Sequence, residues 1–265
     1  MVLPQAHALK ASTVAASGKP YLIYGTAWKA DQTESFVSQA IHAGFRFIDT
    51  ACQPKHYNEQ GVGLGWVQAA KELNLARDDF FLQTKFTPIS GQDPNRVPYQ
   101  VEDELENQVR TSLQVSLQNL QTEYLDSLVL HSPMSELKDT LRVWRAFESF
   151  VDEGKVRQLG ISNCYDLSTL RYLVEAARIK PRVLQNRFYS DSGFDVELRD
   201  FCSENGILYQ SFWTLTGNRR ALASSEFQEL AKSKGLTSQT LMYGEFTRIY
   251  FNSDISLLGL FVIET

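Results

Sequence analysis

The stretch that decides the fold is "YLDSLVLHSPMSELKDTLRVWRAFESFVDEGKVRQLGISN", residues 124–163. Its first run, 124–131, is apolar and typical of a buried strand. Residues 137–154 then carry apolar side chains at helical spacing and stop at a glycine, which often ends a helix. A second strand-like run follows at 156–163. Two strands separated by one helix indicate a parallel pair joined by a right-handed crossover.

The same alternation extends over most of the chain. Strand-like runs also lie at 21–28, 45–49, 80–86, 182–188, 207–213 and 255–263. Helical patterns lie at 33–44, 59–73, 97–121, 166–177, 195–204, 227–234 and 237–250. About eight such units favour the α/β class and a closed (β/α)₈ TIM barrel, with a doubly wound open sheet as the alternative. No linker or repeat divides the chain, so residues 1–265 are expected to form a single domain.

Composition excludes several other classes of protein. A net charge of −5 argues against nucleic-acid binding, which needs a basic face. Three well-separated cysteines (52, 164 and 202) predict neither a disulfide framework nor a metal site. The longest apolar run, 255–263, is about half of the ~20 residues that span a membrane. No secretory signal is evident at the N-terminus, so we expect a cytoplasmic protein, a monomer or weak oligomer.

A barrel gathers its chemistry at the C-terminal ends of its strands. Polar residues recur at or near those ends here: Asp49, Lys85, His131, Ser162, Asn163 and Gln185.

Asp49 and Lys85 are each flanked by apolar residues, so burial would be costly unless the two are paired. A desolvated lysine beside a phenol favours the phenolate, which lowers the tyrosine pKa from its usual ~10. Tyr57 lies in the loop after Asp49, within reach of this pair. It could give a proton to a carbonyl oxygen, while His131 hydrogen-bonds and orients the same oxygen.

At these residues the chain resembles the aldo-keto reductases. The Asp, Tyr, Lys and His of that family match Asp49 in "FRFIDTA", Tyr57 in "YNE", Lys85 in "LQTK" and His131 in "LVLH". The resemblance runs from about residue 21 to 217 and more weakly to about 250. It implies a (β/α)₈ barrel that binds NADPH, with NADH possible, and reduces an aldehyde or ketone. Tyr57 would then be the proton donor, with Lys85 and Asp49 tuning it.

The resemblance also implies contacts to the cofactor and the substrate. Ser162 and Asn163 of "ISN" and Gln185 of "LQN" would bind the nicotinamide carboxamide. The remaining positions are Phe212 stacked on the nicotinamide, Leu215 under the pyrophosphate, Thr26 and Asp49 in the cofactor wall, and Trp28 and His131 in the substrate wall.

Three departures from the family pattern stand out. The loop between Asp49 and Tyr57 is three residues longer than the commonest spacing, and Ser132 replaces a common tryptophan. After Arg248 no lysine or arginine follows, so the usual clamp for the adenosine 2′-phosphate is expected to be absent. Relative to the family the chain thus reads as C-terminally truncated, with strand eight and the tail short or incomplete. Arg219 and Arg220 could compensate, although a solvated pair is the simpler interpretation.

Structural interpretations compete with the functional ones. Asp49 and Lys85 could form only a structural salt bridge, and Ser162–Asn163 could cap a helix. The glycines of "GVGLG" (61–65) predict close helix packing, because they fit no dinucleotide-binding loop. Within the long loop, Lys55 and His56 are expected to be bystanders, and Cys52 a packed residue rather than a nucleophile.

Reduction of a small carbonyl substrate is the leading functional hypothesis. A redox-silent or repurposed relative, such as a binding protein or a non-redox isomerase or cyclase, is the second. An aldolase that forms a Schiff base through Lys85 is the third.

Overall fold

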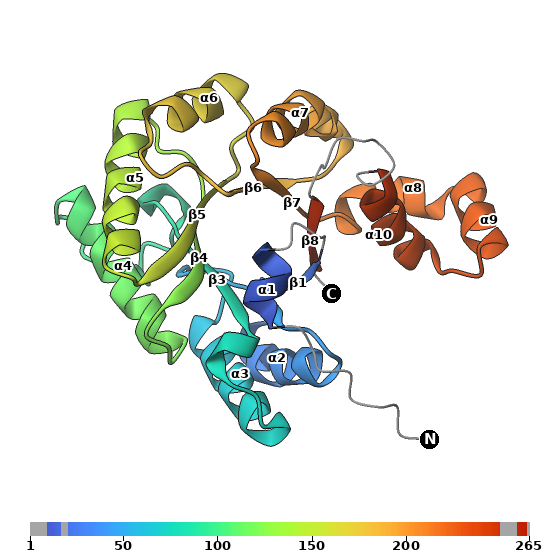
Figure 1. Cartoon of the computed structure of the whole chain (residues 1–265), viewed down its shortest axis with the longest axis horizontal. Helices are drawn as coiled ribbons and strands as arrows, with labels where there is room; N and C mark the ends of the chain where they lie inside the picture. Colours follow the sequence, from blue (N-terminus) through green and yellow to red (C-terminus); the bar gives the residue numbers. More distant parts are fainter. Residues whose placement is uncertain (1–9, 17–20, 250–258, 264–265) are drawn as a thin grey trace.

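Eight parallel strands close into a barrel in the order β1 to β8, as Figure 1 shows. The structure, a computed structural model, describes residues 10–16, 21–249 and 259–263. The strands are β1 (Leu22–Gly25), β2 (Phe47–Asp49), β3 (Phe81–Phe86), β4 (Leu125–Leu130), β5 (Val156–Ser162), β6 (Val183–Arg187), β7 (Leu208–Phe212) and β8 (Gly259–Ile263). The predicted barrel is confirmed, and the open sheet is excluded by its closure.

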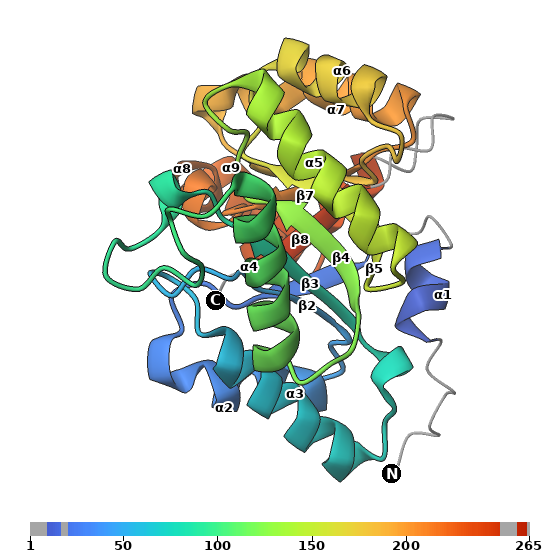
Figure 2. The ribbon, with the colours of Figure 1, turned by 90° about the vertical axis from the view of Figure 1, so that its left-hand side faces the viewer.

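Helices surround the barrel and cover the outer faces of the strands (Figures 1 and 2). One α-helix follows each of the first six strands, whereas the described residues between β7 and β8 contain three α-helices. The helices are α1 (Ala11–Ala16), α2 (Thr33–His42), α3 (Glu59–Leu73), α4 (Leu105–Asn119), α5 (Leu137–Asp152), α6 (Leu167–Ala176), α7 (Val196–Glu204), α8 (Arg219–Ala223), α9 (Ser225–Ser233) and α10 (Ser238–Ile249).

The eighth strand completes the ring. It has five residues, the same length as β6 and β7. It pairs in parallel with β7 on one side and with Leu22, Ile23 and Tyr24 of β1 on the other. The eighth strand of the predicted barrel is therefore present, and its five residues are enough to close the ring. Residues 255–258 of the expected run, and the segment after β8, lie outside the described residues. That residues 1–265 form one domain stays a prediction.

The helix expected at 97–121 begins only at Leu105. Residues 97–104 form bends and a turn instead, and Glu104, with φ −55° and ψ 143°, lies outside the helical region. Pro98 disfavours helical angles in the residue before it. Tyr99 is buried and donates a hydrogen bond from its hydroxyl to Thr87 O at 2.8 Å. That tertiary contact holds the segment against the end of β3 as a loop.

The glycines of α3 pack as their sequence predicts. The helix starts where the Asn58 side chain accepts a hydrogen bond from Gly61 N at 2.9 Å. A Cβ on Gly63 would lie 2.0 Å from Asn119 O at the end of α4, and one on Gly65 would lie 2.5 Å from Glu34 O of α2. These glycines therefore let α3 approach its two neighbours closely.

Helix α1, which the sequence pattern does not predict, covers the N-terminal end of the barrel. Lys10 forms an ion pair with Asp78 beside the start of β3. Ala11 is buried against Ile23, Phe47 and Phe81, which form an apolar layer of the barrel interior. At the opposite end of the barrel, where the strands have their C-terminal ends, lie the loops that connect strands to the helices that follow them.

Candidate active site

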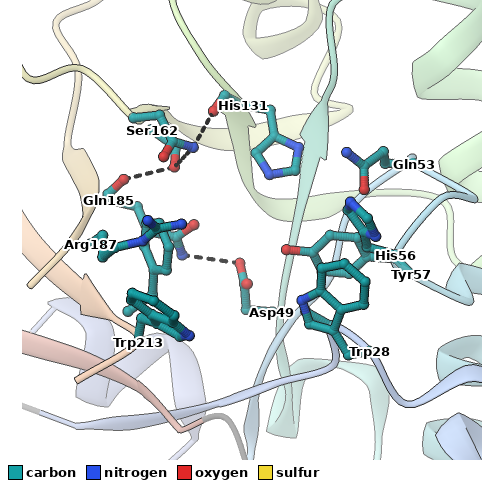
Figure 3. A pocket seen from close by; sticks show the side chains of 13 residues that line it. Trp28, Asp49, Gln53, His56, Tyr57, His131, Ser162, Gln185, Arg187 and Trp213 are labelled. Carbon is teal, nitrogen blue, oxygen red and sulfur yellow. Dashed lines mark hydrogen bonds between the residues drawn. The ribbon is translucent and has the colours of Figure 1, made fainter. Parts of the chain in front are cut away.

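A cavity of about 470 Å³ lies among the residues that end the strands. Its walls come from the segments that end β1, β2, β4, β5, β6 and β7 and from the loop between β2 and α3. It is lined by Ala27, Trp28, Asp49, Gln53, His56, Tyr57, His131, Ser162, Asn163, Gln185, Arg187, Phe212 and Trp213 (Figure 3).

Asp49 and Lys85 form the buried ion pair that the sequence predicts. Lys85 Nζ donates to Asp49 Oδ1 at 2.7 Å, to Asp49 Oδ2 at 2.6 Å and to Thr50 O at 2.8 Å. All three ammonium hydrogens thus have acceptors, as a buried cation requires. Lys85 is 1% exposed and lies behind Asp49, outside the cavity wall.

A layer of buried glutamines supports Asp49 from inside the barrel. Asp49 Oδ1 accepts from Gln83 Nε2 at 2.8 Å and from Gln185 Nε2 at 3.2 Å. Gln83 Nε2 also lies 2.8 Å from Gln210 Oε1, and Gln185 Nε2 lies 3.0 Å from the same atom. Strands β3 and β7 are not neighbours, so the Gln83–Gln210 bond crosses the interior. This network fixes the carboxylate beneath the cavity.

Tyr57 and His131 face each other in the cavity. Their ring centroids are 5.9 Å apart with an edge-to-face angle of 68°, and Lys85 Nζ lies 5.2 Å from the Tyr57 centroid. Figure 3 shows the Tyr57 hydroxyl directed to the middle of the cavity, between Asp49 and His131. His131 Nδ1 is 2.7 Å from Thr87 Oγ1. Burial, then the charges of Lys85 and His56, lowers the pKa of His131 well below 6.5, so the imidazole is neutral at pH 7.

Another wall of the cavity is formed by the hydroxyl of Ser162 and the amides of Asn163 and Gln185. Ser162 Oγ donates to Gln185 O at 2.7 Å, which ties the ends of β5 and β6 together. Asn163 Nδ2 donates to His131 O at 2.8 Å and so connects β5 to β4. Asn163 has a φ of 50°, in the left-handed region that asparagine tolerates better than most residues. Uncharged donors and acceptors are thereby held side by side in fixed positions.

A model of the Aldo/keto reductase family matches residues 21–243. The chain belongs to this family. It is 36% identical over 183 residues to a glyoxal reductase of Bacillus subtilis (strain 168), which covers 69% of this chain and 57% of the relative. It is 32% identical over 160 residues to the methylglyoxal reductase DkgA of Yersinia pestis, covering 60% of this chain and 50% of the relative. The chain thus spans about half the length of these two curated relatives.

Solved structures of the family share the fold. An aldo/keto reductase from Brucella melitensis is 26% identical, with a TM-score of 0.71, and the match covers 92% of this chain and 83% of that chain.

The structure brings most of the expected aldo/keto reductase positions into one cavity. Asp49, Tyr57, His131, Ser162, Asn163, Gln185, Phe212 and Trp28 all line it. Three expected residues do not. Lys85 lies behind Asp49, and Thr26 is buried and donates from Oγ1 to Asp49 O at 2.9 Å. Leu215 lies beyond the cavity wall, in the turn after β7. Thr26 and Lys85 are thus both hydrogen-bonded to Asp49 and do not line the cavity themselves.

Five residues of the cavity wall were not singled out as site residues from the sequence: Ala27, Gln53, His56, Arg187 and Trp213. His56, expected to be a bystander, lies against Trp28 with ring centroids 3.7 Å apart. Nothing in the residue types of that loop reveals this contact, which depends on the path of the loop. Arg187 was detectable, because it lies two residues after Gln185 on β6, and alternate residues of a strand face the same side. Trp213 directly follows β7.

Other sequence expectations concern residues around the site. Cys52 is 2% exposed, and burial raises the pKa of its thiol, which keeps it protonated and unreactive. Arg219 and Arg220 are exposed at the start of α8, as a solvated pair would be. The expected loss of the phosphate clamp concerns the segment after β8, which lies outside the described residues.

Two features are missing from the part of the chain that the structure describes. In residues 10–16, 21–249 and 259–263, no three His, Cys, Asp or Glu side chains gather as metal ligands. The helices of the same residues include none with the length and apolar character to cross a bilayer.

Proposed function

We propose that this protein reduces an aldehyde or ketone to an alcohol with NAD(P)H, with Tyr57 as the proton donor. The observation that carries the proposal is the shared cavity of Tyr57, His131 and Asp49, with Lys85 paired behind Asp49. Membership of the aldo/keto reductase family supports it. Glyoxal and methylglyoxal are the first substrates to test, because two relatives are named as reductases of these compounds.

The cavity residues fit the nicotinamide end of such a cofactor. Ser162, Asn163 and Gln185 each carry a donor and an acceptor, which is the chemistry that a primary carboxamide needs. Phe212 adds an apolar ring to the same wall. When bound there, the reduced nicotinamide supplies the hydride. The proposal names NADPH as the first cofactor to test, with NADH as the second.

Tyr57 and His131 would act together on the carbonyl oxygen. Tyr57 Oη gives its proton to that oxygen as the carbonyl carbon becomes an alcohol carbon. The ammonium of Lys85, 5.2 Å from the ring centroid, stabilises the negative charge left on the phenolic oxygen. In the tautomer in which Thr87 donates to Nδ1, the Nε2–H of neutral His131 donates to the same carbonyl oxygen.

A Schiff-base aldolase is disfavoured by the surroundings of Lys85. A nucleophilic lysine needs a neutral amine with access to substrate. Lys85 instead lies outside the cavity wall, and all three of its N–H groups are bound by Asp49 and Thr50. Borohydride in the presence of methylglyoxal should therefore leave Lys85 without an adduct.

Substitution of Tyr57 by phenylalanine tests the proton donor. The change removes one hydroxyl and keeps the ring that faces His131. We expect kcat for methylglyoxal-dependent NADPH oxidation to fall by about 10²- to 10⁴-fold, the usual contribution of a general acid. NADPH affinity, measured by calorimetry, should remain within about twofold. The matched control is Tyr172→Phe, since Tyr172 lies exposed on α6.

Equal turnover in Tyr57→Phe and wild type would remove Tyr57 from the mechanism. Calorimetry on the wild type also separates the reductase from a redox-silent relative. Micromolar binding of NADPH or NADH supports the reductase, whereas no binding of either supports the repurposed protein.

A further inference from the structure

Arg187 stands at the end of β6, across the cavity from Tyr57 and His56, as Figure 3 shows. Its guanidinium lies 4.2 Å from the ring centroid of Trp213, 5.4 Å from that of Tyr189 and 5.9 Å from that of Phe212. Its backbone N–H donates to Tyr165 Oη at 3.1 Å. Aromatic rings and the strand therefore hold the guanidinium in place at the cavity wall.

This cation has no anionic partner in the described part of the chain. Its Nε is shielded from solvent and lacks a hydrogen-bond partner among those residues. Arg77, another partly buried arginine, shows the usual arrangement: its guanidinium bonds Asp126 Oδ2, Thr122 Oγ1 and two backbone carbonyls. Stacking on an aromatic ring stabilises the charge of Arg187 but uses only the face of the guanidinium. The in-plane N–H groups suit an oxyanion.

The charges around the cavity leave a net positive charge, which favours the binding of an anion. Asp49 is the sole carboxylate among the lining residues, and Lys85 neutralises it at 2.6 Å. His131 is neutral because its pKa is lowered by burial. Arg187 is thus left as the uncompensated charge in a partly desolvated wall, where a ligand anion would be attracted more strongly than in water.

We propose that Arg187 binds an oxyanion inside the candidate active site. This inference rests on the proposed function in one respect, that the cavity holds substrate and cofactor together. The oxyanion is then either a carboxylate of the carbonyl substrate or a phosphate of the cofactor, because a guanidinium binds both in the same bidentate way.

The experiment compares Arg187→Gln with Arg182→Gln. Arg182 is exposed just before the first residue of β6, so its substitution makes the same change of charge away from the cavity. The substrates are 4-carboxybenzaldehyde and 4-methylbenzaldehyde, which have similar size and differ in charge. NADPH binding to each variant is measured by calorimetry. Benzoate and inorganic phosphate are titrated into each protein without cofactor, with tryptophan fluorescence as the signal.

If the oxyanion is a carboxylate of the substrate, we expect Arg187→Gln to lose activity only toward the charged aldehyde. In Arg187→Gln, kcat/KM for 4-carboxybenzaldehyde should fall about tenfold to hundredfold, the loss expected for one charge-assisted pair. The value for 4-methylbenzaldehyde and the Kd for NADPH should stay within about twofold. If the oxyanion is a phosphate of the cofactor, we expect the Kd for NADPH to rise by a similar factor. The kcat/KM values for the two aldehydes should then fall equally. Either result supports oxyanion binding at Arg187.

The proposal is overturned if Arg187→Gln matches Arg182→Gln in both aldehydes, in NADPH affinity and in the titrations. A different set of results would show that the proposed reductase function is wrong while Arg187 still binds an oxyanion. The wild type would reduce neither aldehyde, while benzoate or phosphate would still bind and would lose affinity in Arg187→Gln alone.

Discussion

His131 carries a measurable consequence at the scale of single residues. Burial and the nearby charges of Lys85 and His56 lower its pKa in the folded protein, while an unfolded histidine titrates near ~6.5. Between these two values the unfolded chain binds the additional proton, so the free energy of unfolding falls as the pH drops below about 6.5. Above that value the contribution of His131 is fully present.

Replacing His131 with glutamine should weaken this dependence on pH. Urea denaturation at pH 7.5 and 5.5 gives the loss of unfolding free energy for each protein, and the loss should be smaller for His131→Gln than for wild type. His56, whose pKa is also lowered mainly by burial, remains in both proteins and cancels in the comparison. An equal loss in the two proteins would show that His131 is readily protonated in the fold.

Individual site residues can be predicted where the position along a strand determines which side chains reach the cavity. Asp49, Lys85, His131 and Gln185 lie at or near strand ends, and parallel strands bring such ends to one edge. Arg187, two residues after Gln185 on β6, is predictable from the same alternation. The contact between the His56 and Trp28 rings cannot be predicted in this way, because it depends on backbone angles such as the φ of 63° at Trp28.

At the scale of elements, the contact between α3 and α4 depends on one missing side chain. A Cβ on Gly63 would lie 2.0 Å from Asn119 O and 3.0 Å from Asn119 C. Both are backbone atoms that cannot rotate away. Trp66 of the same helix donates from Nε1 to Leu120 O at 2.7 Å, so the two helices are also joined by a buried hydrogen bond.

Gly63→Ala should therefore lower the free energy of unfolding by about 1–3 kcal/mol, the usual cost of overpacking. Gly244→Ala is the matched control, because Gly244 lies within α10 and a Cβ added there would meet no atom of the described residues within 4 Å. There alanine should be neutral or stabilising by about 0.5–1 kcal/mol. Guanidinium denaturation measures both, and equal effects would contradict the close contact.

Most elements could be predicted from periodicity, and the failures have physical causes. Alternating strand and helix patterns located all eight strands and most of the helices. Residues 97–104 have apolar residues at helical spacing, yet the buried Tyr99 and its bond to Thr87 O draw them into a loop. Helix α1 has six residues, too few for a periodic pattern to be read, and α8 has five.

At the scale of the whole molecule, the two ends of the barrel differ: one contains the candidate active site and the other a buried ion-pair network. The N-terminal end holds an ion-pair network around Asp126, which is 2% exposed. Its carboxylate accepts from Arg77 at 2.8 Å, from Arg157 at 2.9 Å and from Leu82 N at 3.0 Å. This group connects β3, β4 and β5 at the end of the barrel opposite the candidate site.

Asp126→Asn should cost about 3 kcal/mol of unfolding free energy, since it leaves two arginines without their anion. Asp152→Asn, which breaks the exposed pair with Arg178, should cost less than about 1 kcal/mol. Chemical denaturation measures both losses. NADPH affinity of Asp126→Asn should stay within about twofold of wild type at a temperature where both are folded. A large change in affinity would mean that the two ends are coupled.

The pairing of β1 with β8 has a consequence for biosynthesis. Residues 22–24 pair on this side with residues 261–263, so this edge of β1 stays unpaired until residues 261–263 have been synthesised. At about 5–20 residues per second, that edge stays exposed on the ribosome for roughly ten seconds or more. Unpaired strand edges attract other strands, so this edge of β1 is where a nascent chain is expected to associate with other chains before the ring closes.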